Sequence, residues 1–339
     1  MRPAPGVAWL LDPEQPAVRC RTLTELLDRP ASDPEVAAAR RAIVRKGWVR
    51  EILDAQVPGG GWDVGPSSYV PKYLATNWRM LVLSDLGVDR SMPEIAALCE
   101  RWMAAFPLAG GGVGGNSKGT GHHCVVGNLA RGLCRMGYGD DPRVRRSMEW
   151  LVETASPLGG WSCFGSGRNL DSWEGLSAFA AYPRERWTAE MTAVVGKAAE
   201  FFLERELHRQ GGRYAPWYRL HYPVHYYYDL LVGLEILTAL GYGSDPRLGV
   251  AHRWLLGKRR ADGRWPLDAV HPDAGATMAR WYRAHPRDRP TPWALEPVGA
   301  PSRMVTLRAL TVLRRLAPSV PGRRRNVKPA RPSHRPGRS

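Results

Sequence analysis

Long apolar stretches are absent from this sequence, and cysteine, lysine and phenylalanine are scarce. No segment approaches 18 consecutive apolar residues, so we expect no membrane-spanning helix. No N-terminal stretch joins a basic region to a long apolar run, so we expect no signal peptide. The five cysteines are an odd number without a paired Cys-x-x-Cys motif, which predicts free thiols and a cytoplasmic protein.

Common catalytic motifs are also missing. The sequence has no phosphate loop, dinucleotide fingerprint, Gly-x-Ser-x-Gly elbow or His-Glu-x-x-His helix. The Gly-rich stretch 109–121 lacks the Gly-Lys-Ser/Thr ending of a phosphate loop, so we interpret it as a turn at the rim of the fold.

The aromatic content is concentrated in two residue types. Fourteen Trp and twelve Tyr stand against five Phe, in a chain that is 44% hydrophobic and can bury a full core. Trp and Tyr combine a large apolar face with a polar edge, so they suit the walls of a cavity. Packing between repeated units is the alternative explanation.

The net charge of +16 is distributed unevenly. Residues 322–339 hold seven Lys or Arg and no acidic residue, which leaves +9 for the rest of the chain. We predict that residues 318–339 form a disordered basic tail, either solvated or in contact with an anionic membrane surface. No aromatic residue interleaves these basic residues, so we expect no specific nucleic acid partner.

A Gly-Gly-aromatic turn, or a close relative of it, recurs along the chain. GGGW ends at Trp62, GGGV at Val113, GGW at Trp161, GGRY at Tyr214 and DGRW at Trp265. The successive steps are 51, 48, 53 and 51 residues. A period near fifty residues with fixed punctuation is typical of stacked supersecondary units.

Between these turns the pattern is helical. Apolar residues at spacings of three and four, ended by glycine, predict helices over 74–87, 126–137 and 229–241. Asp141 and Asp245 each precede Pro-Arg, so they are predicted to be structural N-caps with proline in the first turn. A first hairpin is predicted over 21–28 and 34–55, and a last helix over 302–316.

These features predict an all-α protein. The expected architecture is a closed α/α toroid (α6/α6 barrel) of about six helical hairpins, with Gly-Gly-Trp-type turns at one rim. One helix of each hairpin forms the inner wall and the other lies outside. Residues 1–18 are expected to be an N-terminal extension, 19–317 the toroid and 318–339 the tail.

The GGGW, GGW and DGRW turns at this spacing resemble the repeats of the squalene cyclase and protein prenyltransferase superfamily. The resemblance covers residues 20 to about 316. It implies a single toroid around a cavity, with the chemistry at the starts of the inner helices, just after the Gly-rich turns. The repeat signature is specific for the fold and says little about the reaction.

Residues 161–176 depart from both chemistries that the resemblance implies. A prenyltransferase has Arg and Lys for diphosphate here and Asp and Cys for zinc. Arg168 and Asp171 match that pattern, but the Lys is absent and Trp173 replaces the Cys. A protonating cyclase has Asp-x-Asp-Asp, where this chain has Asp171-Ser-Trp173-Glu174. Asp171 and Glu174 share a helical face, so one carboxyl can keep the other protonated, unless the pair is a capping arrangement.

Cysteine and histidine residues near the starts of inner helices suggest a metal site. Cys124 and Cys163 are 39 residues apart, which spans one hairpin and brings both toward one rim. His225 resembles the zinc histidine of the prenyltransferases. We therefore consider a mixed Zn²⁺ site of Cys124, Cys163 and His225, completed by Asp171 or Asp229. Buried free thiols and a capping histidine explain the same residues.

The sequence HYPVHYYYD at 221–229 is the densest aromatic and polar cluster in the chain. Aromatic faces stabilise positive charge, so such a cluster suits an isoprenoid chain or an allylic cation. The predicted substrate-binding residues are Arg168, Trp173, His221, Tyr222, Tyr226 and Tyr228.

Three functions fit these observations. The leading hypothesis is cyclisation or prenyl transfer of an isoprenoid or other long apolar substrate, with Asp171 or Glu174 as the acid or Arg168 holding diphosphate. A non-catalytic lipid- or protein-binding scaffold predicts a filled centre, or a cavity without a group of shifted pKa. A glycan-acting α/α-barrel hydrolase predicts two catalytic carboxylates such as Asp171 and Asp229.

Overall fold

The computed structural model describes residues 5–63, 67–163, 168–271, 282–286, 291 and 293–316. In these ranges the chain is helix and loop, apart from strands β1 (Pro107–Leu108) and β2 (Gly112–Val113), which pair antiparallel. The predicted all-α class is confirmed. The tail predicted at 318–339 lies outside the described residues. No helix within these ranges is long and apolar enough to cross a membrane.

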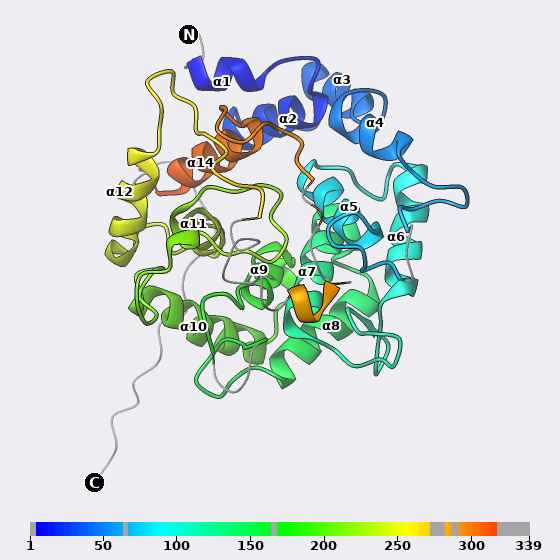
Figure 1. Cartoon of the computed structure of the whole chain (residues 1–339), viewed down its shortest axis with the longest axis vertical. Coiled ribbons are helices and arrows are strands. Elements are labelled where there is room, and N and C mark those ends of the chain that lie inside the picture. Colours follow the sequence, from blue (N-terminus) through cyan, green and yellow to red (C-terminus); the bar gives the residue numbers. More distant parts are fainter. Residues whose placement is uncertain are drawn as a thin grey trace.

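Figure 1 shows the helices as an inner and an outer set around a common centre. The inner set is α2 (Pro16–Arg21), α5 (Thr76–Asp85), α7 (His123–Leu133), α9 (Glu174–Ala181), α11 (Leu230–Ala239) and α14 (Arg303–Leu316). The outer set is α1 (Pro5–Leu10), α3 (Pro34–Ala42), α4 (Gly47–Asp54), α6 (Pro93–Ala105), α8 (Pro142–Glu153), α10 (Ala189–Glu204) and α12 (Gly249–Gly257). Short π or 3₁₀ turns cover Thr22–Leu26, Cys134–Tyr138, Arg184–Arg186, Ala215–Tyr218 and Pro246–Leu248. Helix α14 contacts α11 and α2, so the last described helix meets the first inner one.

The first hairpin differs from its prediction, whereas α5, α7, α11 and α14 lie where helices were expected. The segment 34–55 is not one helix, because it breaks between α3 and α4. At the break Gly47 has φ +68°, and a Cβ on it would lie 2.8 Å from the Glu14 carbonyl oxygen. Only glycine takes up this conformation and this close approach at low cost. Helix α2 begins at Pro16, inside the stretch assigned to an extension.

The tryptophans of the repeated turns make the same contact in three repeats. Each indole N–H donates to the carbonyl oxygen ten residues earlier, near the end of the preceding outer helix. The bonds are Trp62 to Ile52 at 2.8 Å, Trp161 to Leu151 at 2.9 Å and Trp265 to Leu255 at 2.7 Å. All three rings are at least 97% buried. These tryptophans therefore tie each turn to its outer helix, which is the packing role considered above.

The two Asp-Pro-Arg sequences form matching ion-pair networks. Asp141 caps α8 by accepting a hydrogen bond from the Arg143 backbone N–H, and the Arg143 guanidinium reaches Glu100 of α6 at 2.7 Å. Asp245, Arg247 and Glu200 repeat this arrangement two repeats later. The structural role predicted for both aspartates is confirmed.

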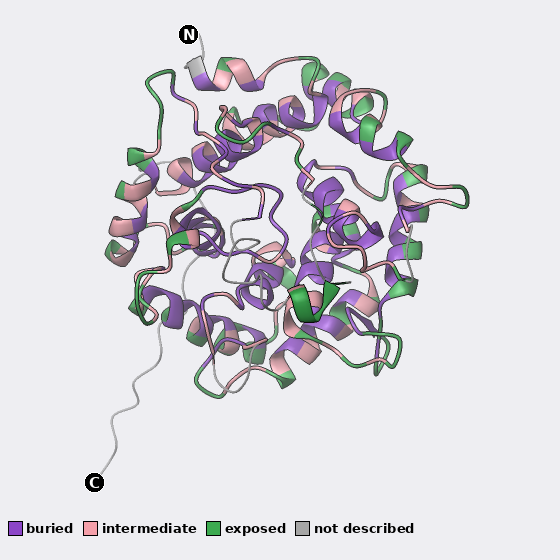
Figure 2. Cartoon of the chain, viewed as in Figure 1, coloured by how far each residue is buried: buried purple, intermediate pink, exposed green. Residues whose placement is uncertain are grey.

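The inner helices are buried on nearly all sides, whereas the outer helices keep an exposed face (Figure 2). The closest inner pair is α7 and α9. A Cβ on Gly127 of α7 would lie 2.5 Å from the Glu174 carbonyl carbon at the start of α9. Gly127 thus allows α9 to approach α7 and sets the position of Glu174.

We expect Gly127→Ala to destabilise the protein by about 1–3 kcal/mol, because the new methyl group overlaps backbone that cannot give way. Gly196→Ala in α10 is the matched control, since a Cβ there meets nothing within 4 Å. It should stabilise the protein by about 0.5–1 kcal/mol through helix propensity. Urea unfolding of the two variants measures both changes. Equal changes in the free energy of unfolding for Gly127→Ala and Gly196→Ala contradict the close approach of α9 to α7.

Candidate functional site

A cavity of about 1010 Å³ opens where the inner helices begin. Tyr73 precedes α5, Cys124 lies in the first turn of α7, Glu174 begins α9 and Tyr228 precedes α11, and all four line the cavity. Gly114, Gly115, Asn116 and Ser117 of the Gly-rich turn also line it. The cavity is large enough for a drug-sized or isoprenoid molecule.

Aromatic residues are the largest group in the wall of this cavity. Its rings come from Tyr69, Tyr73, Phe106, Tyr214, Trp217, Tyr226, Tyr227, Tyr228 and Tyr282. Hydroxyl pairs join segments far apart in the sequence, with 2.8 Å between the Tyr69 and Tyr226 oxygens and 2.9 Å between those of Tyr73 and Tyr227. The hydroxyls thus fix the ring orientations, whereas the faces of the Tyr73 ring are covered by His225 and His271.

Two carboxyl groups face the cavity, and neither is a helix cap. Asp171 Oδ1 accepts a 2.8 Å hydrogen bond from the Trp217 indole N–H, and α9 has no side-chain cap at all. The capping arrangement considered from the sequence is therefore wrong. Glu174 is 2% exposed and its Oε2 has no hydrogen-bond partner among the described residues.

Burial raises the pKa of Glu174 well above its ordinary value, and the neighbouring Cys163 adds to the effect. Burial also raises the pKa of Asp171, although the bond from Trp217 opposes this. Glu174 therefore combines a held proton, an unpartnered oxygen and a position on the cavity wall. Such a group can donate a proton to a ligand.

The structure brings Cys124 and Cys163 together, as the one-hairpin spacing predicted. The Cys124 backbone N–H donates to Cys163 Sγ at 3.2 Å. Hydrogen bonding from the Cys124 thiol lowers the pKa of Cys163, and the same bond raises the pKa of Cys124. The Cys163 thiolate therefore adds negative charge beside Glu174 and favours the protonated carboxyl.

His225 does not join the two thiols in a metal site. Its ring stacks on Tyr73 with 4.6 Å between centroids, and burial lowers its pKa well below the ordinary value. Within the described ranges no group of three or more His, Cys, Asp and Glu side chains is placed to hold a metal ion.

Asp229 and His221 have structural roles that the sequence did not separate from catalytic ones. Asp229 caps α11 through the Val232 N–H at 2.8 Å, and its other oxygen is 2.7 Å from His221 Nδ1. Both residues are completely buried and neither lines the large cavity. We therefore do not retain Asp229 as a catalytic residue or His221 as a substrate-binding residue.

Three further predicted binding residues lie away from the large cavity. Arg168 donates to the Leu158 carbonyl oxygen and stacks on Phe201 at 4.5 Å. Tyr222 is 1% exposed and does not line the cavity. The Trp173 indole donates to the Tyr226 carbonyl oxygen at 3.1 Å, which fixes the 221–228 segment. Of the predicted binding side chains, Tyr226 and Tyr228 line the large cavity.

Tyr69 and Tyr73 were not predicted from the sequence as cavity residues. Both lie between the GGGW turn and α5, in the sequence Tyr69-Val-Pro-Lys-Tyr73. This segment stands before an inner helix, as HYPVHYYYD does, and also combines tyrosine with proline. That parallel is the signal that could have identified them.

Comparison with known proteins gives one limited similarity. No family model matches the chain. The chain is 27% identical over 146 residues to a probable squalene–hopene cyclase from Sinorhizobium fredii. The match covers 38% of this chain and 22% of the relative, so the chain spans well under two thirds of that protein. The similarity supports the squalene cyclase side of the superfamily resemblance at a general level.

The raised pKa of Glu174 predicts a specific dependence of stability on pH. The unfolded state loses this proton near the ordinary pKa of 4.5, whereas the folded state holds it to higher pH. The group therefore stabilises the fold below pH 4.5, and this contribution is lost as the pH rises toward the folded-state pKa. We expect the melting temperature of Glu174→Gln to rise relative to wild type between pH 4.5 and 8.

Glu100→Gln is the control for this experiment, because hydrogen bonding from Arg143 lowers the pKa of Glu100. Its removal should lower the melting temperature by a constant amount between pH 4.5 and 8, and this difference should disappear only as the pH falls below 4.5. A constant difference between Glu174→Gln and wild type across this range contradicts a protonated Glu174.

The lowered pKa of Cys163 predicts selective alkylation. At pH 7, iodoacetamide should modify Cys163 before Cys124, since only the thiolate attacks and both thiols line the same cavity. Cys99 is fully buried and its pKa is raised to about 12 by burial, so it should stay unmodified. Peptide mass spectrometry at several reaction times measures the order. Faster modification of Cys124 contradicts the assignment of the thiolate.

Proposed function

We propose that this protein binds an isoprenoid or another long apolar substrate in the large cavity and starts its cyclisation by protonating a double bond. Glu174 is the acid. The observation that carries the proposal is a buried carboxyl on the wall of the cavity, whose pKa is raised by burial and whose Oε2 has no partner among the described residues.

The reaction is balanced by proton transfer alone. Glu174 gives its proton to one carbon of an alkene, the π electrons form the new C–H bond, and the neighbouring carbon becomes a cation. A second double bond of the same chain attacks this cation and forms a ring bond. Loss of a proton from the final cation to the carboxylate or to water completes an isomerisation.

The aromatic wall supplies the electrostatic part of this mechanism. Trp and Tyr faces attract a cation without offering a nucleophile that captures it. A long apolar substrate that fills the cavity also displaces water, which otherwise quenches the intermediate. Tyr69 and Tyr73 precede α5, and Trp217 and Tyr226 precede α11, so aromatic side chains from two inner-helix starts line the cavity that a folded chain would occupy.

The alternatives have less support. Prenyl transfer needs cations for diphosphate, but Arg168 is engaged by Leu158 and Phe201 outside the large cavity. A glycan hydrolase needs two accessible carboxyls, and Asp229 is a buried cap. A cavity that only binds a ligand does not require a buried acid with a raised pKa and an unpartnered oxygen at its wall.

The test uses the full chain with squalene and a linear prenyl diphosphate in detergent, in D₂O. A protonation-started cyclisation should incorporate one carbon-bound deuterium per product and release no diphosphate, as measured by gas chromatography with mass spectrometry. We expect Glu174→Gln to lower turnover about 10²- to 10⁴-fold, because general acid catalysis contributes that much. Substrate binding should persist, since the substitution preserves shape.

Asp171→Asn is the matched control, because Asp171 lines the same cavity but is bound by Trp217. Its effect on turnover should be much smaller than that of Glu174→Gln. Loss of activity in Asp171→Asn with activity retained in Glu174→Gln overturns the assignment of the acid. Tight binding of both substrates without conversion favours the scaffold.

A further inference from the structure

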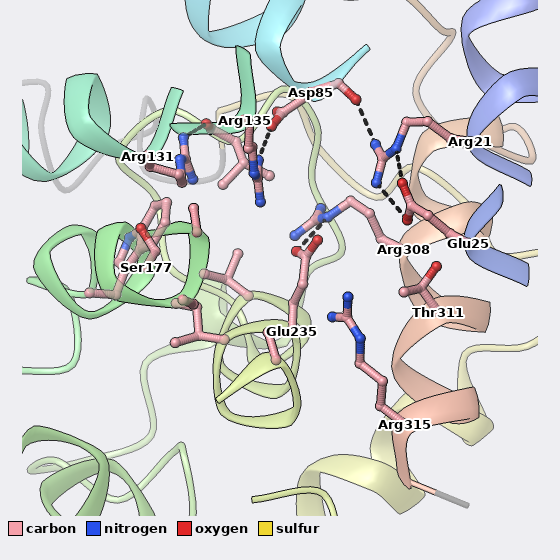
Figure 3. Close-up of a pocket in the computed structure, with 17 residues that line it drawn as sticks. Arg21, Glu25, Asp85, Arg131, Arg135, Ser177, Glu235, Arg308, Thr311 and Arg315 are labelled. Atoms are coloured by element: carbon pink, nitrogen blue, oxygen red, sulfur yellow. Dashed lines mark hydrogen bonds and ion pairs between the residues drawn. The ribbon is translucent and has the colours of Figure 1, made fainter. Parts of the chain in front are cut away.

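A second, smaller cavity of about 240 Å³ lies at the other ends of the inner helices (Figure 3). Asp85 ends α5, Ala181 ends α9 and Ala239 is the last residue of α11, and all three line it. Its charged side chains are Arg21, Arg131, Arg135, Arg308, Arg315, Glu25, Asp85 and Glu235. The proposed cyclase mechanism uses none of them.

The two cavities are separated by the segment 221–228 and by Trp173. Side chains of α7 and α14 hold this segment through its carbonyl oxygens: Asn128 donates to His225, Arg131 to Val224 and Arg308 to His221. Trp173 and Val224 line the smaller cavity, whereas Glu174 and Tyr226 line the larger one. The smaller cavity is therefore a distinct site.

Three of the five arginines are neutralised by the three carboxylates. Arg21 pairs with Glu25 at 2.6 Å, Arg308 pairs with Glu235 at 2.9 Å, and Arg135 pairs with Asp85. Arg131 and Arg315 form no ion pair within 4.0 Å in the described part of the chain. Five positive and three negative side chains leave a net charge of +2 around the cavity.

Several donors at this site are unused. Arg131 is 2% exposed and its Nε has no partner among the described residues, and the same holds for Arg308 Nη2 and the Thr311 hydroxyl. Figure 3 shows the Arg315 guanidinium near Arg308, with no interaction drawn to it. Burial lowers the pKa of Arg131 to about 10 and also lowers that of Arg315. Arg131 and Arg315 therefore lack the carboxylate partner among the described residues that normally accompanies a buried guanidinium group.

The surrounding helix ends explain only part of the arrangement. The carbonyl ends of helices carry partial negative charge and favour nearby cations. However, the carbonyl oxygens of the 221–228 segment and of Asp85 already receive bonds from Arg131, Arg308 and Arg21. Arg131 Nε, Arg308 Nη2 and the Thr311 hydroxyl have no protein acceptor in the described structure. An added acceptor with negative charge satisfies both the charge and the donors.

We propose that the smaller cavity binds a small divalent oxyanion of the phosphate or sulfate class. Its charge of −2 matches the excess at the site, and its several oxygens can each accept from a guanidinium fork or a hydroxyl. Arg308, Thr311 and Arg315 of α14 are the ligands, because Figure 3 shows these three side chains together at one side of the cavity. Arg131 lies at the opposite side and adds to the positive charge without contacting the anion. This proposal is independent of the cyclase reaction.

The experiment measures binding of inorganic phosphate, sulfate and nitrate to the full chain by calorimetry, and the melting temperature at equal ionic strength. We expect saturable binding of phosphate and sulfate, weaker binding of nitrate, and a rise in melting temperature with anion concentration. Arg315→Gln should weaken sulfate binding at least about tenfold, because it removes a charged donor. Its fold should survive, since Arg315 has no ion pair with the described residues.

Arg145→Gln is the matched control, since it removes the same charge from a side chain that is 64% exposed. It should change sulfate affinity less than about twofold, which separates a site from a general salt effect. Thr311→Val is a second variant that keeps the side-chain shape, and it should weaken binding without unfolding the protein. Phenyl phosphate distinguishes the two possible sources of the anion. If the site does not bind phenyl phosphate, its ligand is a free ion. If the site binds phenyl phosphate as well as inorganic phosphate, its ligand is the head group of a larger molecule. Equal affinities of Arg315→Gln and Arg145→Gln for sulfate, absence of saturable binding, or a preference for nitrate overturns the proposal.

Discussion

The common direction of the inner helices is the constraint on which both cavities depend. Each repeat enters its inner helix after a Gly-rich turn, so α5, α7, α9 and α11 all begin at one end of the molecule. Helix starts carry partial positive charge and helix ends carry partial negative charge. The repeats therefore create two different electrostatic environments along one axis. The aromatic wall with Asp171 and Glu174 occupies the first, and the five arginines with three carboxylates occupy the second.

The position of Glu174 at a helix start opposes the increase in its pKa. A helix start favours the ionised carboxylate by about 0.3–1 kcal/mol, and by up to about 2 kcal/mol when it is partly buried. Removing a carboxylate from water without a partner costs several kcal/mol, so burial outweighs the helix start. Glu174 has no described partner at Oε2, and Cys163 adds negative charge nearby. The raised pKa of Glu174 therefore comes from what surrounds α9, not from α9 itself.

The sequence predicted the repeats well and the site only in part. The Gly-Gly-aromatic period and the helical spacing predict the all-α class correctly. Both are local sequence patterns, and they recur because each repeat forms the same turn and the same helices. Asp171 and Glu174 were identified, but the sequence could not separate them from Asp229, since a cap and an acid are the same residue type. His225 was wrongly grouped with the cysteines because sequence register does not fix which side of a segment faces a cavity. The arginine-lined cavity was not predicted, because its residues come from all six inner helices and from segments between them, which lie far apart in the sequence.

The separation of charge between the two cavities also bears on the type of reaction. Cation chemistry can start by protonation, which needs an acid, or by loss of diphosphate, which needs several cations around the leaving group. Among the described residues lining the large cavity the basic side chains are Lys72 and His122, and Lys72 lies over the rings of Tyr69 and Tyr226. The five arginines stand beyond the 221–228 segment and Trp173. A diphosphate in the large cavity would lack their charge, whereas an uncharged alkene needs only Glu174 and the aromatic wall. The placement of charge therefore favours protonation as the first step.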